Sequence, residues 1–209
     1  MPSGMTKTEV FNLALDLVKE KPILSVDDPS STARYLKRNF NHAARTIMRA
    51  YPWNFAKEFR ELSADETRPL FKWYYAYTLP AGWARVIPPT VNGHRFGQPI
   101  PHEIVGNKIY TNYPAPLRVI LIMDKTANPG AWDDLFTEMV RCTLALGMAN
   151  KFTSKSKYVE LASQLLAQAT VKAEEIDAYE GSPEPADAFD VIRVRGSGDS
   201  EYAVNGTWR

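Results

Sequence analysis

Hydrophobic residues recur with helical spacing near the N-terminus of the chain. Apolar residues at positions 10, 13, 14, 17 and 18 fall on one helical face, and Thr6 with Glu9 has the spacing of a capping box. Pro22 predicts the end of this helix. A second apolar stripe at positions 33, 36, 40, 43, 44 and 47 follows a start signal at Asp27-Asp28-Pro29. We therefore expect two helices before Pro52.

The spacing changes to that of strands between residues 54 and 128. Strand-like runs lie at 55–62, 73–79, 85–87, 104–105, 108–110 and 117–123, and the last of these has six apolar residues beside one arginine. Asn92-Gly93 and Gly106-Asn107 are two-residue hairpin signals. We expect five or six strands, mostly antiparallel because the joining loops are too short for parallel crossovers. The run 117–123 should be the most buried.

Helical spacing resumes after Pro129-Gly130 and ends before Pro183. One stripe begins at Trp132, and a second begins at Tyr158 and continues to about Tyr179. Short connections make successive helices antiparallel neighbours. The expected fold is α+β, with a four-helix bundle-like domain, an antiparallel β insert between helices two and three, and an extended C-terminal tail. Its segments are 1–53, 54–128, 129–181 and 182–209.

Composition excludes few classes of protein. The 209 residues suffice for a substantial core, and 25 Lys and Arg against 24 Asp and Glu give a net charge of +1. This balance argues against a dedicated nucleic-acid binder, although charge can be segregated within a neutral total. The absence of a span of about 18 apolar residues and of a signal-peptide pattern predicts synthesis in the cytoplasm and no membrane partner.

Catalytic and metal-binding patterns are weak. The single Cys142 precludes an intrachain disulfide, and its helical spacing favours a buried structural thiol. His102 has no further metal ligand at a useful spacing. The paired carboxylates at 27–28 and 133–134 fall at helix starts, where they satisfy free backbone N–H groups. We therefore expect no catalytic residues, no cofactor and no metal, although a small hydrolase with loop-borne residues remains an alternative.

Two other groups of residues are candidates for structural roles. The aromatic junction between the helical and strand patterns predicts a packed corner formed by Trp53, Phe55, Tyr77 and Pro80. The second helix also has basic residues outside its apolar stripe, which can face solvent, a neighbouring subunit or DNA. These residues are Arg34, Arg38, Arg45 and Arg49.

The order of these patterns resembles a known family. Two N-terminal helices lead into Pro-Trp-Asn-Phe-Ala-Lys at 52–57, a strand follows to about Leu62, and Tyr-Thr-Leu-Pro stands at 77–80 before the β insert and two long helices. This arrangement, over residues 5 to 180, resembles the tail tubular protein A family of tailed bacteriophages and, more widely, phage head-to-tail adaptors. The segment 95–112 departs from the family pattern.

The resemblance implies a structural virion protein at the head–tail junction and no enzymatic activity. In that family about a dozen copies form a ring below the portal protein, and the ring extends the DNA channel towards the tail. The helices would form the ring body, and the β insert would face the downstream tail or nozzle protein. Genomic DNA would pass through without sequence-specific binding.

The C-terminal tail has apolar residues among polar ones, which suggests ordering against a partner. The resemblance implies that this partner is the portal, contacted by Phe189, Val191, Ile192, Val194, Tyr202 and Trp208. A terminus without a partner, or one folded back on its own domain, remains open. A different class of function, a nucleic-acid-binding regulator that uses the basic face of the second helix, also remains open.

Overall fold

The computed structural model of the chain describes residues 4–69, 71–93, 97–152 and 156–180. Their helices are α1 (Lys7–Leu17), α2 (Ser31–Ala50), α3 (Asp134–Phe152) and α4 (Ser156–Glu180). Their strands are β1 (Lys57–Leu62), β2 (Tyr75–Thr78), β3 (Trp83–Ile87), β4 (His102–Val105), β5 (Lys108–Thr111) and β6 (Leu117–Met123). Three short 3-10 helices are η1 (Asn54–Ala56), η2 (Val91–Gly93) and η3 (Pro129–Ala131). This mixture of helices and antiparallel sheets confirms the predicted α+β class.

Local chemistry sets the ends of the first two helices. The predicted capping box is present, because the Thr6 hydroxyl accepts from the Glu9 N–H at 3.3 Å and the Glu9 carboxylate accepts from the Thr6 N–H at 2.7 Å. α1 ends at Leu17, earlier than Pro22 suggested, and Lys19 then adopts a left-handed φ of 58°. The predicted start of α2 at Asp27-Asp28 is also wrong. Its cap is Ser30, whose hydroxyl accepts from Ala33 N–H at 3.2 Å.

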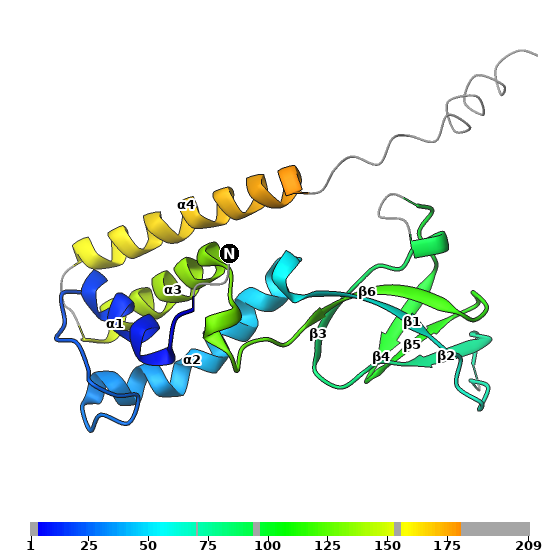
Figure 1. The fold of residues 1–209 in the computed structure, drawn as a ribbon, viewed down its shortest axis with the longest axis horizontal. Coiled ribbons are helices and arrows are strands. Elements are labelled where there is room, and N and C mark those ends of the chain that lie inside the picture. The colour runs from blue at the N-terminus through cyan, green and yellow to red at the C-terminus, as the bar shows by residue number, and fades with distance from the viewer. Residues whose placement is uncertain (1–3, 70, 94–96, 153–155, 181–209) are drawn as a thin grey trace, which may run out of the picture.

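The helices form one layered body in which α3 packs against each of the other three. Figure 1 shows α4 on one side of this body and α2 on the other, with α1 and α3 between them. Their buried side chains make a common core that includes Phe11, Phe40, Trp132 and Phe136. This arrangement places the two longest helices on opposite outer sides of the molecule.

The strands form two three-stranded antiparallel sheets, with orders β1-β6-β3 and β2-β5-β4. β6 is the central strand of the first sheet, and its Leu117, Leu121 and Ile122 are fully buried, which confirms it as a buried strand. A second core lies between the sheets around Tyr77, Ile109 and Leu117. The sheets lie beyond the end of the helical body and make the molecule elongated (Figure 1). The division into two sheets was not predicted.

One of the two hairpin signals is confirmed and the other is wrong. Val105 pairs with Lys108 across Gly106-Asn107, and Gly106 has the positive φ of 62° that such a turn requires. Asn92-Gly93 instead belongs to η2, and the Val91 N–H donates to the Gln98 carbonyl at 2.9 Å. Pro88 and Pro89 directly follow β3, and prolines have no N–H with which to extend a ladder.

The predicted C-terminal tail, residues 182–209, lies outside the described residues. Within the described ranges, no helix is both long and apolar enough to cross a membrane.

Candidate functional site

Reactive groups are not gathered in the parts of the chain that the structure describes. Within those ranges, no set of three or more His, Cys, Asp or Glu side chains is placed to hold a metal ion. Cys142 is fully buried on α3, as predicted for a structural thiol. Burial, together with the charge of Glu138, raises the pKa of its thiol to about 12, so the nucleophilic thiolate is disfavoured.

The aromatic junction is built around Trp53. Its ring is 4% exposed, and its indole N–H donates to the Ile47 carbonyl near the end of α2 at 3.0 Å. Phe136 of α3 meets Trp53 edge-on at 5.1 Å between centroids and Phe55 at 5.3 Å. Trp132, which follows the β insert, contacts the same Phe136 at 4.8 Å. The chain therefore enters and leaves the insert through one aromatic cluster.

The four predicted corner residues do not lie together. Trp53 and Phe55 pack in or against the helical core, whereas Tyr77 is fully buried in the core between the sheets. The Tyr77 hydroxyl donates to the Tyr113 carbonyl at 2.8 Å. Pro80 is partly buried in the segment between β2 and β3. The sequence predicted that these residues pack together, but it gave no sign that they belong to two separate cores.

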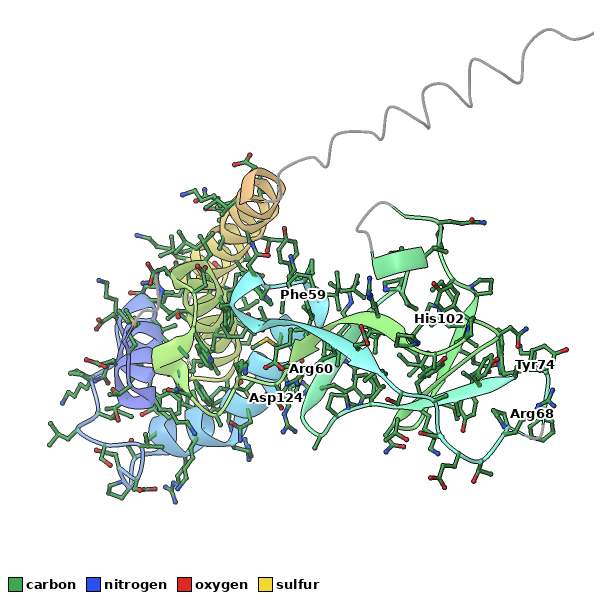
Figure 2. All side chains as sticks on the ribbon, turned by 45° about the vertical axis from the view of Figure 1, so that its right-hand side comes forward. Phe59, Arg60, Arg68, Tyr74, His102 and Asp124 are labelled. Carbon is green, nitrogen blue, oxygen red and sulfur yellow. The ribbon has the colours of Figure 1, made fainter. Side chains whose placement is uncertain are left out.

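Polar contacts fix the sheets to the helices. Arg85 of β3 donates to the Arg49 and Ala50 carbonyls at 3.2 and 3.0 Å, where α2 ends. Arg45 of α2 pairs with Asp124, just after β6, at 3.0 Å. Partial burial opposes ionisation of Asp124, but hydrogen bonds from Thr126 and the Arg45 charge together lower its pKa. Figure 2 shows Asp124 at this junction of the two parts.

The basic residues predicted on the second helix form a stripe on α2. Arg34, Arg38, Arg45 and Arg49 are all exposed. At 100° per residue they fall within an arc of about 60°, directed away from the buried face of the helix. Among them only Arg45 has an acidic partner within the described residues. We call these four residues the arginine stripe.

A groove lies at the end of the β insert farthest from the helices. Its volume is about 790 Å³, and it lies between the segment 67–73 and the outer face of the β2-β5-β4 sheet. Its apolar lining is Pro69, Phe71, Trp73, Ala76, Val105 and Tyr110, and its charged lining is Arg68, Lys72, Glu103 and Lys108. Phe71 is 89% exposed and Tyr74, beside the groove, 55%. Figure 2 shows Arg68 and Tyr74 at this far end.

Polar contacts hold the segment beside the groove in place. Asp65 accepts from Lys108 at 2.7 Å and from Thr78 at 2.9 Å. Burial would raise the pKa of Asp65, but these contacts outweigh it and lower the pKa. At the other end of the segment, the Trp73 indole N–H donates to Glu103 at 3.0 Å, and the Arg68 guanidinium lies 4.8 Å from the Tyr74 ring centroid. These contacts hold the walls of the groove, from which Phe71 and Val105 face solvent.

A second surface with exposed apolar side chains lies along α4, where exposed polar residues such as Gln168 and Lys172 stand between them. Leu161, Val171 and Ile176 are 39%, 54% and 45% exposed, whereas Ala162, Ala169 and Ala173 are buried. The stripe predicted from Tyr158 to about Tyr179 included Leu161 and Ile176, and their exposure shows that these two residues do not lie on the buried side of the helix. The side of α4 that packs against α3 includes the small Ala162, Ala169 and Ala173, whereas Leu161, Val171 and Ile176 lie on other sides of the helix. The alternation of alanine with leucine and valine along the helix was the available signal.

No model of a known protein family matches the chain, and no curated protein resembles it closely enough to be a relative.

Proposed function

We propose that this protein is a structural head-to-tail adaptor of a tailed bacteriophage. In this proposal its copies form a ring of about a dozen subunits below the portal, and the ring extends the DNA channel and joins the tail. The four helices form the ring body as a bundle, and the β insert projects towards the downstream tail or nozzle protein. In this proposal the protein is a component of the virion, is assembled into it in the host cytoplasm, and catalyses no reaction.

The observation that carries the proposal is the separation of two exposed apolar surfaces. One follows α4 on the outside of the helical body, and the other surrounds the groove at the opposite end of the elongated molecule. Contiguous exposed apolar patches are typical of surfaces that contact other proteins. A chain with two such surfaces can hold two different neighbours at once, as an adaptor must.

The two surfaces suit different neighbours. A closed ring of identical copies needs a heterologous contact along the side of the body, and α4 offers three exposed apolar side chains there. The groove offers exposed aromatic side chains and fixed walls, which suit a segment of the next tail component. Resemblance at segments 52–57 and 77–80 adds support that is independent of these surfaces.

Electron microscopy of the purified protein, alone and mixed with portal, tests the proposal. We expect rings or ring-like complexes on the portal. Val171→Glu, on the exposed side of α4, should abolish ring formation. Ser163→Glu adds the same charge at an exposed position on the other flank of α4, away from Leu161 and Ile176, and should reduce ring formation less. Absence of any assembly in both native samples would refute the proposal.

The competing function, a nucleic-acid-binding regulator, draws on the arginine stripe. A regulator must also read base edges to select its sites. A DNA titration in which one sequence is strongly preferred over others would favour the regulator over the adaptor.

A further inference from the structure

The arginine stripe has a physical character that differs from the two apolar surfaces. α2 has five basic residues and no acidic one, although the whole chain is almost neutral. Lys37 is paired with Asp27 and Arg45 with Asp124. Within the described part of the chain, Arg34, Arg38 and Arg49 have no acidic partner. The Arg38 guanidinium lies 6.0 Å from the Tyr35 ring centroid, a contact that leaves its N–H groups available. Three guanidinium groups can therefore pair with an anionic ligand.

The stripe is continuous and straight. From Arg34 to Arg49 it covers fifteen residue steps, or about 22 Å along the helix axis. Asn41 and His42 are also exposed and lie about 20° outside opposite edges of this arc. Asparagine and arginine side chains are typical donors to phosphate oxygens. Double-stranded DNA has one phosphate per about 1.7 Å of its axis with both strands counted, so a duplex segment of this length has about a dozen phosphates, of which the stripe can reach those on one side.

The stripe lacks what a protein partner would require. Among the described residues, all the large apolar side chains that are exposed lie outside α2. Protein interfaces have apolar centres in which charged residues are depleted. Figure 1 also shows α2 on the side of the helical body opposite α4, away from the exposed apolar side chains of that helix. A polyanion suits this surface better than a second protein does.

We infer that the arginine stripe of α2 binds the sugar–phosphate backbone of double-stranded DNA without reading its sequence. The guanidinium groups of Arg34, Arg38 and Arg49 each pair with phosphate oxygens, with which a planar guanidinium can form two parallel hydrogen bonds. Binding in this way requires neither a ring nor a portal.

Salt dependence gives the expected magnitude. Each neutralised phosphate contributes about −0.9 to the slope of log affinity against log salt for B-DNA. Three contacts give a slope of about −2.7, so affinity should fall by about 40-fold between 50 and 200 mM salt.

The test compares two variants with the same change in net charge. In the stripe variant, Arg34, Arg38 and Arg49 are each changed to Gln, and Arg45 is kept so that its pair with Asp124 survives. In the control variant, the exposed Lys21, Lys157 and Lys172 are each changed to Gln. Gln has almost the helix propensity of Arg and Lys, so both variants should fold, and their thermal melting curves verify this.

Fluorescence anisotropy with a labelled 20-base-pair duplex of mixed sequence measures binding. The native chain and the control variant should both show the steep slope, and the stripe variant should show a slope near zero with little binding at 50 mM salt. Unlabelled duplexes of unrelated sequence should compete equally. Equal slopes for the two variants, no binding by the native chain at 50 mM salt, or strong preference for one duplex would each overturn the inference. None of these outcomes decides whether the chain assembles on a portal, which electron microscopy measures separately.

Discussion

Replacing Trp53 with alanine should destabilise the whole fold, because its ring joins the end of α2, the start of the β insert and α3. The side chain is 4% exposed and contacts Tyr51, Phe55 and Phe136. Truncations of large aromatic residues in cores typically cost about 3–5 kcal/mol. Loss of the indole N–H also leaves the Ile47 carbonyl without this donor. We expect a loss of about 4 kcal/mol.

Thermal and urea denaturation followed by circular dichroism measure this loss. For a chain of about 200 residues, 4 kcal/mol corresponds to a fall in Tm of about 8–16 °C. Trp73→Ala provides the control, because Trp73 is only partly buried at the rim of the groove and has one side-chain hydrogen bond, to Glu103. That variant should lose about 1 kcal/mol or less. A Trp53→Ala curve that matches the Trp73→Ala curve would refute the reasoning.

Two further predictions concern the groove and the C-terminal segment. The folded-state pKa of Asp65 lies below its ordinary value of 3.8, so its contribution to stability is present above that pH and is lost as pH falls through the folded value. Asp65→Asn should therefore be less stable than the native chain at pH 7, and urea titrations should show this difference in stability narrow below pH 3.8. Glu66→Gln, at the neighbouring exposed position, serves as the control variant. Deleting residues 182–209 should leave Tm almost unchanged, because both described cores lie before residue 181. The same deletion should abolish attachment to the portal, measured by co-sedimentation. Normal attachment of the shortened chain would show that the portal contact lies elsewhere.

Signals that act over a few residues were easiest to predict from the sequence. The Thr6–Glu9 capping box and the Gly106-Asn107 hairpin each depend on side chains and dihedral angles within one turn. The start of α2 was mistaken because Asp28 and Ser30 are both good caps, and only the structure shows that the Asp28 carboxylate accepts from the Ser30 N–H at 2.9 Å. Where two nearby residues can each cap a helix, the sequence alone does not show which of them does.

Pairing between distant segments was beyond prediction. β1 pairs with β6 across about sixty residues, and no periodicity records which strands become neighbours. The arginines of α2 were recognised as candidates, but their isolation from apolar side chains required the exposure of every helix to be known. The groove was missed entirely, because its lining comes from three strands and a connecting segment that have no common sequence pattern.

The two ends of the β insert lie next to each other in space. Lys57, at its start, is the register partner of Ile122, near its end, and the flanking Trp53 and Trp132 both rest on Phe136. A segment whose ends already meet can be lengthened, shortened or exchanged without moving the rest of the molecule. A graft at residues 57 and 122 would therefore be the place to exchange the β insert while keeping the helical body.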